Sequence, residues 1–296
     1  MELRTLAYFR TVADEGNITN AAGVLHVTQP TLSRQIAQLE AELGQPLFLR
    51  GHGGVELTER GAILYRYACD ILDLATKAEE EVALPAHALA GTVRIGAGET
   101  RAMALLGRAM KAVHERYPGI RFELRDGTSA ELMESFVKGF FDVLLECDVQ
   151  PHANLNALEL PVRDVWGALV PKGDPLAARD VIRPQDLEGR TCIVSGQGAK
   201  RALTRWLEPS ADRLNVFVSY SLPLNAYFLA EEGTGVLLTY GGLVDGRARS
   251  NLCFRELSPR LEARHGVLWH KTMPTRPTQV FLDELRRVCD EVEPGE

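Results

Sequence analysis

Long apolar runs, paired cysteines and catalytic motifs are all missing from this chain of 296 residues. No apolar run approaches the roughly 20 residues that a membrane-spanning helix needs, and the charged, amphipathic start does not resemble a secretory signal peptide. The five cysteines are scattered, with neither disulfide nor metal-ligand spacing. These absences predict a cytoplasmic protein with no membrane association, no metal and no cofactor.

Enzymatic activity is not indicated either. The seven histidines lack ligand spacing, and the sequence contains no Gly-x-Ser-x-Gly, no His-Glu-x-x-His and no Gly-Lys-Ser/Thr phosphate loop. Gly196-Gln197-Gly198 before a predicted helix is a weak phosphate-loop signal because the third glycine is missing. We therefore expect no catalytic residues, while 45% hydrophobic and 25% charged residues predict globular domains.

The most informative segment is residues 17–44, where the pattern predicts two helices joined by a tight turn. The second helix has a candidate N-cap in Thr28, and Pro30 stands in its first turn, where no backbone N–H is needed. The first helix would pack Ala21 and Ala22 against it. The buried stripe of the second helix is predicted at Leu32, Ile36, Leu39 and Leu43. This pattern is a helix-turn-helix, which typically binds DNA.

The remaining faces near the start of the second helix are polar and not acidic. Arg and Gln side chains can form two hydrogen bonds with guanine or adenine in the major groove. Strands at 46–50 and 55–57 around the turn His52-Gly53-Gly54 predict a wing that lies along phosphates. The candidate DNA contacts are Thr28, Gln29, Pro30, Thr31, Ser33, Arg34, Gln35, Arg50 and His52. For Arg50, a plain solvated surface position is the alternative.

Together these features resemble the N-terminal domain of LysR-type transcriptional regulators. The resemblance covers residues 1–61 almost without gaps, on LRTLAYFRTVADEGNITNAA, TQPTLSRQIAQLEAELGQPLFLR and LTERG. It implies a winged helix-turn-helix, a long dimerisation helix and a two-lobed, periplasmic-binding-protein-like effector domain. It also implies an activator or repressor that binds promoter or operator DNA as a homodimer or homotetramer. Such a regulator responds to a small-molecule effector and, as an activator, contacts RNA polymerase.

A heptad pattern in residues 58–89 predicts a long pairing helix without help from the resemblance. Thr58 is its expected N-cap, Glu59 suits its first turn, and Pro85 marks its end. The predicted dimerisation seam is Leu64, Ala68, Ile71, Ala75, Ala78 and Val82. A seam this narrow favours pairing with a second copy, and a helix that lies on its own domain is the alternative.

The charge of the chain is not typical of a DNA-binding protein. The net charge is −7, and residues 1–90 hold 7 Lys or Arg against 12 Asp or Glu. Most of these acids fall late in the second helix or on the pairing helix, where they can face away from DNA. We therefore expect sequence-specific binding with a shallow dependence on salt.

From Gly91 onward strands and helices alternate, which predicts an α/β fold with a mostly parallel sheet covered on both faces. Crossovers between two lobes are expected near Pro161 and His265, with two strands around Pro161 in residues 155–170. The expected divisions are a winged DNA-binding domain at 1–60, a linker helix at 58–89 and an effector-binding domain at 91–296, with lobe I at about 91–161 and 266–296 and lobe II at about 162–265.

Ligands of open α/β sheets lie at the carboxyl ends of strands, near helix starts. The candidate effector contacts there are Thr100, Arg101, Thr128, Ser129, Glu146, Ser195, Gln197 and Thr239. Hydroxyls and free N–H groups at helix starts bind carboxylates, whereas Glu146 and Asp148 would prefer an amine, so the charge of the effector stays open. Each hydroxyl is equally an ordinary helix cap. A solute-binding module is the rival interpretation of this half of the chain.

Overall fold

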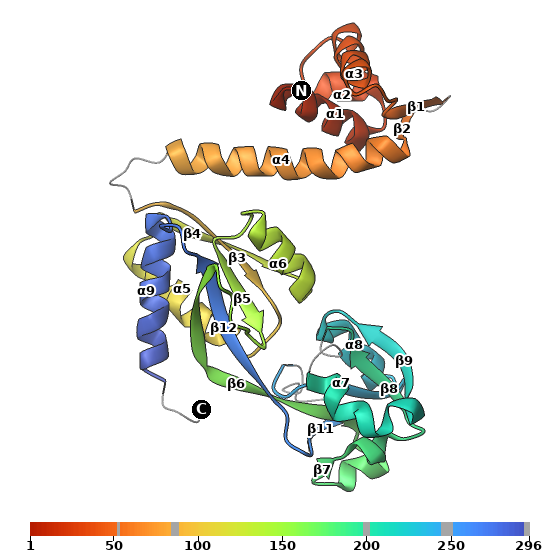
Figure 1. The fold of residues 1–296 in the computed structure, drawn as a ribbon, viewed down its shortest axis with the longest axis vertical. Helices are drawn as coiled ribbons and strands as arrows, with labels where there is room; N and C mark the ends of the chain where they lie inside the picture. Colours follow the sequence, from red (N-terminus) through yellow and green to blue (C-terminus); the bar gives the residue numbers. More distant parts are fainter. Residues whose placement is uncertain (52–53, 84–88, 198–201, 244–250, 293–296) are drawn as a thin grey trace. The chain divides into compact units, whose positions relative to one another are not determined.

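The N-terminal unit, Met1–Ala86, combines helices with a two-stranded wing. The computed structural model describes residues 1–51, 54–83, 89–197, 202–243 and 251–292. The elements of this unit are α1 (Leu3–Glu15), α2 (Ile18–Val24), α3 (Gln29–Leu43), β1 (Phe48–Gly51), β2 (Gly54–Leu57) and α4 (Glu59–Ala83) (Figure 1). The helix-turn-helix and wing predicted from the sequence are both present.

Local chemistry explains where the first helices begin and end. The side chain of Asn17 accepts hydrogen bonds from the N–H groups of Thr19 (2.8 Å) and Asn20 (3.2 Å), and so caps α2. Gly16 and Gly44 follow α1 and α3 in the left-handed conformation, which costs glycine little. The two glycines therefore set the points at which the chain leaves each helix.

The buried stripe of α3 supports this unit, but it is shorter than the sequence predicts. Leu32, Ile36 and Leu39 are fully buried. Leu43 is 42% exposed, because it is the last residue of α3 and the chain turns away at Gly44. The other buried apolar side chains of this core are Leu6, Phe9, Val12, Ala21, Ala22, Leu47, Phe48 and Ala68.

The wing is fixed to the end of α1. β1 and β2 pair in antiparallel fashion, and the N–H of Val55 donates to the carbonyl of Gly16 (2.8 Å). Gly54 has a φ of 147°, and a Cβ there would lie 2.2 Å from the Gly16 oxygen. Only glycine permits this close approach, so the wing keeps its position relative to the helices.

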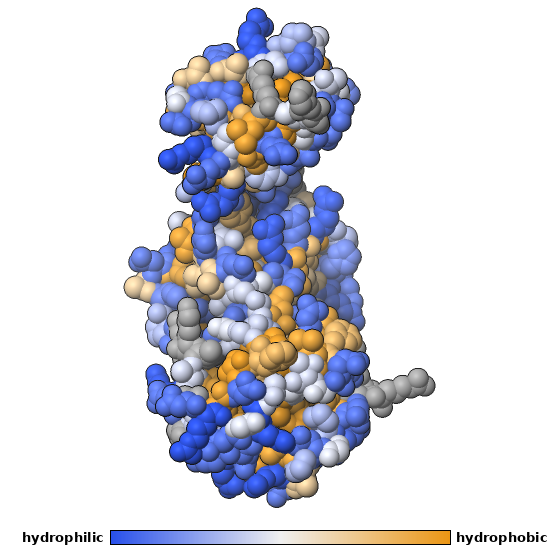
Figure 2. Space-filling model, turned by 90° about the vertical axis from the view of Figure 1, so that its right-hand side faces the viewer, coloured by the Kyte–Doolittle hydropathy of each residue, from blue (hydrophilic) through white to orange (hydrophobic). Residues whose placement is uncertain are grey.

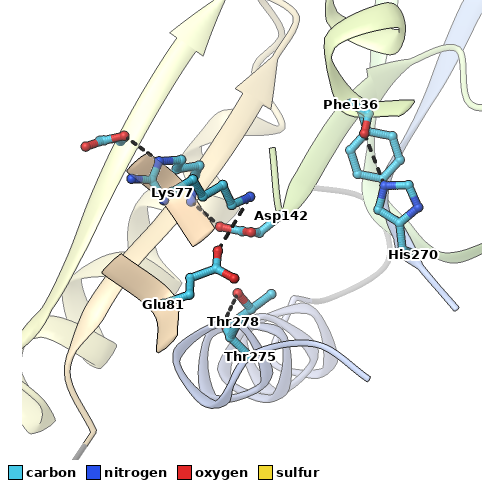
Figure 3. Close-up of polar contacts among 9 residues, drawn as sticks. Lys77, Glu81, Phe136, Asp142, His270, Thr275 and Thr278 are labelled. Atoms are coloured by element: carbon cyan, nitrogen blue, oxygen red, sulfur yellow. Dashed lines mark hydrogen bonds and ion pairs between the residues drawn. The ribbon is translucent and has the colours of Figure 1, made fainter. Parts of the chain in front are cut away.

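The long helix α4 starts with the predicted cap. Thr58 Oγ1 accepts from the N–H of Gly61 (2.9 Å) and donates to the carbonyl of Pro46 (2.8 Å). Further along, Lys77 forms an ion pair with Glu81 at 3.7 Å (Figure 3). Among the described helices, α4 included, none has the length and apolar character needed to cross a membrane.

The second unit, His87–Glu296, contains two lobes that share one mixed sheet. The strand order is β4-β3-β5-β12-β6 in lobe I and continues from β6 through β10-β8-β9 in lobe II, where β11 and β7 join β6. The elements of lobe I are β3 (Gly91–Ala97), α5 (Met103–Arg116), β4 (Ile120–Asp126), α6 (Ser129–Val137), β5 (Val143–Cys147), parts of β6 (Leu155–Pro171) and β12 (Glu262–His270), and α9 (Arg276–Asp290).

Lobe II is built between the two long strands. Its elements are η1 (Pro175–Ala178), β7 (Val181–Ile182), η2 (Pro184–Leu187), β8 (Thr191–Ser195), α7 (Ala202–Leu207), η4 (Glu208–Arg213), β9 (Asn215–Tyr220), α8 (Pro223–Glu231), β10 (Val236–Tyr240) and β11 (Leu252–Leu257). Alternate residues of β10 face opposite layers: Val236 and Leu238 pack with α7, whereas Leu237 packs with α8. Helices therefore cover both faces of the sheet.

Lobe I is layered in the same way. α5 and α9 pack on one face of its strands and α6 packs on the other (Figure 1). The ring of His270 at the end of β12 stacks on Phe136 of α6, with centroids 4.4 Å apart, and its Nε2 lies 3.1 Å from the Phe136 carbonyl oxygen (Figure 3). His270 thus joins a strand to a helix and is not available as a metal ligand.

The two crossovers between the lobes are continuous strands. The sequence predicts two strands around Pro161, but β6 runs unbroken through that residue. The register of β12 against β6 shifts between Arg264 and Gly266, so Pro161 falls where the ladder is interrupted. A proline, which has no N–H to donate, is tolerated in a sheet at such a bulge. The prediction of a break at Pro161 was wrong for this reason.

Candidate DNA-binding surface and effector cleft

The start of α3 presents a polar surface above a buried stripe. Thr28 does not cap α3 through its side chain as predicted; its hydroxyl lies 2.8 Å from that of Thr31. Gln29 Nε2 donates to Ser33 Oγ (3.1 Å), which orders the same surface. The backbone N–H groups at this helix start therefore keep no side-chain acceptor from the N-cap.

Arg34 and Gln35 complete this surface. The side chain of Arg34 is exposed and that of Gln35 half-buried, and neither forms a hydrogen bond or ion pair with the residues that the structure describes. Pro30 is exposed at the first turn. The structure therefore leaves two side chains able to pair with base edges beside a helix N-terminus, which carries partial positive charge.

Two of the predicted DNA contacts, Arg50 and His52, belong to the wing. Arg50 pairs with Val55 in the β1–β2 ladder, which places it on the wing. His52 lies outside the described residues. The prediction of phosphate contacts from the wing therefore rests on the position of Arg50 in the hairpin.

Two acids near α3 are engaged within the unit. Glu40 Oε1 accepts from the N–H groups of Leu47 (2.7 Å) and Phe48 (3.1 Å), and so anchors the start of the wing. Glu42 pairs with the N-terminal ammonium group at 2.7 Å. Both carboxylates therefore have partners within the unit.

The predicted seam on α4 needs a correction. Ala68 is fully buried in the core of its own unit and so offers no surface to a second copy, whereas Leu64 is partly buried against that core. Ala75 is half-buried and Ala78 exposed. The exposed apolar face of α4 is instead formed by Ile63 (40%), Tyr67 (50%), Ile71 (37%), Leu74 (41%) and Val82 (86%). α4 therefore carries one buried stripe and one exposed apolar stripe, and sequence spacing did not tell them apart.

A cleft of about 640 Å³ lies within the second unit, lined by residues from both lobes. Six predicted effector residues line it: Thr128, Ser129, Glu146, Ser195, Gln197 and Thr239. Asp148, named above as a carboxylate that would prefer an amine, also lines it, as do Glu99 and Tyr240; the lining residues that the prediction missed include His152 and Trp166. Trp166 could not have been expected there, because the position depends on β6 continuing past Pro161 into lobe II.

Thr100 and Arg101 are not among the lining residues, although both were predicted effector contacts. The helix α5 begins at Met103, three residues after Thr100. Thr100 is buried, and its hydroxyl accepts from the N–H of Ala102 (3.1 Å), while the N–H of Arg101 donates to Asp164 Oδ2 (3.3 Å). These groups hold the turn between β3 and α5.

Three N–H groups at the start of α6, beside the cleft, already have partners. Thr128 and Glu131 form a reciprocal capping box, in which Glu131 accepts from the N–H of Thr128 (3.1 Å) and Thr128 Oγ1 accepts from the N–H of Glu131 (3.3 Å). The N–H of Ser129 donates to Gln197 Oε1 (2.7 Å), which belongs to lobe II. Gln197 therefore links the lobes across the cleft and uses a donor that an anion would otherwise bind.

Carboxylates of lobe I set the charge at the ends of β3 and β5. Burial, followed by the charge of Asp126, raises the pKa of Glu99. Burial also raises the pKa of the Cys147 thiol to about 12, together with the charges of Asp164, Glu146, Asp148 and Glu99. Cys147 is thus a neutral thiol at physiological pH, which does not fit a nucleophile or redox sensor.

The crossover strands also hold a buried polar pair. His265 Nε2 lies 3.2 Å from Asp164 Oδ2 without the geometry of a hydrogen bond, and both side chains are fully buried. Asp164 Oδ1 has no hydrogen-bond partner among the described residues. Among all the residues that the structure describes, no group of three His, Cys, Asp or Glu side chains is placed to hold a metal ion.

Comparison with known families accounts for both units. Residues 3–62 match the family model described as "Bacterial regulatory helix-turn-helix protein, lysR family", and residues 86–290 match "LysR substrate binding domain". The chain therefore belongs to the LysR family of DNA-binding transcriptional regulators, whose second domain binds an effector. The prediction of the family and of its regulatory, non-enzymatic class is confirmed.

Individual relatives agree with this assignment. The transcriptional regulator YybE of Bacillus subtilis is 30% identical over 79% of this chain and 77% of its own length. The nitrogen assimilation regulatory protein Nac of Escherichia coli is 36% identical over 56% of this chain, and the match spans 55% of that relative.

Solved structures share the fold. The full-length regulator CbnR, crystallised with its target DNA, has a TM-score of 0.75 and 21% identity and covers 97% of this chain and 100% of its own. A single-residue variant of full-length OxyR from Pseudomonas aeruginosa has a TM-score of 0.56 at 24% identity and covers 97% of this chain and 100% of its own. Both neighbours are full-length proteins, and the likeness extends over both units of this chain.

Proposed function

We propose that this regulator recognises its operator through the exposed polar surface at the start of α3. The observation that carries the proposal is the pair Arg34 and Gln35, unengaged on a helix whose opposite stripe is buried. Arg pairs with guanine and Gln with adenine in the major groove. Thr28, Gln29, Thr31 and Ser33 beside them, with Pro30 at the helix start, then set the register of α3, and Arg50 of the wing contacts phosphate.

Pairing of two copies follows from the exposed apolar face of α4, defined above from Ile63 to Val82. Burying such a face on a second copy removes apolar surface from water. It also holds two DNA-binding domains together, so that they can bind a DNA site with two-fold symmetry. Exposed apolar side chains also gather on β9 and α8 of lobe II: Val216, Phe217, Leu224, Phe228 and Leu229. Figure 2 shows hydrophobic surface on the lower part of the molecule, where lobe II lies. We propose that a homotetramer uses this surface.

The effector acts from the cleft. Gln197 and Ser129 form a hydrogen bond between the lobes, so a ligand between them changes the relation of lobe II to lobe I. Such a ligand shifts the regulator between two arrangements only if it binds one of them better. The regulator acts on promoter DNA in the cytoplasm, and as an activator it contacts RNA polymerase.

Fluorescence anisotropy tests the proposed sequence-specific binding of DNA through α3. The fragment upstream of the regulator's own gene is compared with a shuffled fragment across a salt series, with wild-type protein and Arg34→Ala. We expect Arg34→Ala to lose about 1–3 kcal/mol of discrimination between the fragments, and the salt dependence of the wild type to be shallow because few phosphates are neutralised.

The matched control is Arg108→Ala, which removes an exposed arginine from α5 in the second unit and should leave both affinities unchanged. An equal loss by Arg34→Ala on both fragments would assign Arg34 to phosphate and contradict base reading. Absence of any preference by the wild type on this fragment would contradict control of its own gene.

A further inference from the structure

We propose that the effector is an organic cation, a primary amine on an apolar or aromatic body, bound with its ammonium group against lobe I. This inference rests on the cleft being the effector site, as proposed above. The site is defined by the cavity between the lobes and by the family of its domain. The charges of its walls then decide which chemical class it takes.

The start of α6 offers an anion in the cleft few free N–H donors. At the start of α6, the N–H groups of Thr128, Ser129 and Glu131 are bonded to the Glu131 carboxylate, to Gln197 and to Thr128 respectively. An anionic ligand would have to break the contact between the lobes to reach the N–H of Ser129. The described lining contains no Lys or Arg.

The same cleft offers a cation uncompensated carboxylates. Glu99 and Asp148 line it and form no ion pair with the residues that the structure describes. Glu146 is partly compensated, since His152 Nε2 lies 3.3 Å from its Oε2. Glu262, at the rim, is paired with Arg260 at 2.9 Å. Glu99 and Asp148 therefore supply the negative charge that an ammonium group would neutralise.

The opposite wall suits the rest of such a molecule. The ring centroids of Trp166 and Tyr240 lie 4.4 Å apart, and both residues line the cleft. Aromatic faces attract cations and cover apolar groups. Ser195 and Thr239 add neutral hydroxyls from lobe II. A ligand that spans the cleft thus meets acids on lobe I and aromatic or hydroxyl groups on lobe II.

Two pairs of probes that differ mainly in the sign of their charge test the proposal on the full-length protein. Tyramine is compared with 4-hydroxyphenylacetate, and 1,4-diaminobutane with succinate, by calorimetric titration and by intrinsic tryptophan fluorescence, to which Trp166 in the cleft contributes. Millimolar affinity suffices, because the sign of the charge is the question. We expect each amine to bind at least about tenfold more tightly than its acidic counterpart, as expected for one favourable charge contact.

Two variants locate the ammonium group. Glu99→Gln and Asp148→Asn should each weaken amine binding by about tenfold. Asp148 has a φ of 58°, and asparagine tolerates this left-handed conformation, so the backbone is preserved. The control, Glu134→Gln on α6, removes an exposed carboxylate outside the cleft and should leave binding unchanged.

Tighter binding of the acids, no binding of either amine, or equal amine binding by all three variants would overturn the proposal. Operator binding is measured separately by anisotropy. If the wild type binds its operator and prefers the acids, the regulator stands and the assignment of an amine fails. If it binds no operator, the DNA-binding proposal fails whatever the probes do.

Discussion

Two helix starts of this protein share a local sequence pattern but differ in their chemistry. α3 follows Thr28 and α6 follows Thr128, and both threonines are N-cap residues with an extended backbone. Thr28 makes no side-chain cap bond, whereas Thr128 takes part in a complete capping box. Gln197 then engages a further N–H at α6, that of Ser129, from the other lobe.

The difference shows that a threonine before a helix does not reveal whether the N–H groups in the first turn of that helix are available to a ligand. At α3 the donors beside Arg34 are left without a side-chain acceptor from the N-cap, as suits a helix that approaches phosphates. At α6 the donors of Thr128, Ser129 and Glu131 are used within the protein, which favours a ligand that needs none of these three. An N-cap threonine therefore precedes N–H groups without a side-chain partner from the cap at α3, and N–H groups with side-chain partners at α6.

Removing the contact between the lobes should give the largest effect. Gln197→Ala frees the N–H of Ser129, so we expect the affinity for 4-hydroxyphenylacetate to rise by about tenfold, the value of one hydrogen bond to a charged group. The control is Gln185→Ala, an exposed glutamine that does not line the cleft. Titration calorimetry measures both. An unchanged affinity for the acid would show that Gln197 does not shield this helix start.

Removing each threonine hydroxyl should separate the two helix starts directly. Thr128→Ala removes a cap and should lower the free energy of unfolding of the second unit by about 1 kcal/mol. Thr28→Ala removes no cap bond and should change the stability of the N-terminal unit by no more than about 0.5 kcal/mol. Calorimetric unfolding of the two variants checks this. Equal losses would mean that Thr28 caps α3 in solution.

The smallest effect concerns the pH dependence of Glu99. Its pKa is raised in the folded state, so between its ordinary and its raised pKa the folded protein binds more protons, and stability falls as pH rises. Glu99→Gln removes this loss of stability. We expect the variant to be more stable by less than about 1 kcal/mol near neutral pH, since the side chain is partly exposed, and equal to the wild type below the ordinary pKa.

Melting temperatures across a pH series measure the effect. The isosteric change Asp283→Asn on α9 serves as a control for loss of an exposed acid, since Asp283 lies outside the cleft. Destabilisation by Glu99→Gln near neutral pH would indicate that this carboxylate has a stabilising partner in the folded protein.

The sequence predicted most of the N-terminal unit because its signals are local. Helix periodicity, Pro30 at the start of α3 and the Thr58 cap of α4 each act within a few residues. The errors at Leu43 and Ala68 concern which neighbour covers a side chain, and the error at Thr28 concerns the partner of its hydroxyl. Spacing along a helix shows that a stripe is buried, but it does not show against what.

The cleft was less accessible to sequence reasoning. Six of its residues could be predicted because strand ends and helix starts meet at one edge of a sheet. The placement of Trp166, the start of α5 at Met103 and the contact of Gln197 with Ser129 depend on segments far apart in the chain. No local pattern encodes such contacts, so only the packed structure reveals them.

By itself, the sequence determined the family, the order of the elements and the polar surface at the start of α3, because each depends on short-range patterns of apolar and polar residues. The tertiary structure decided which face of α4 stays exposed, how β6 passes Pro161 and which charges line the cleft. The physical reason is that burial and hydrogen bonding are settled between distant segments. A donor or carboxylate acquires its function only when the fold has determined whether it already has a partner.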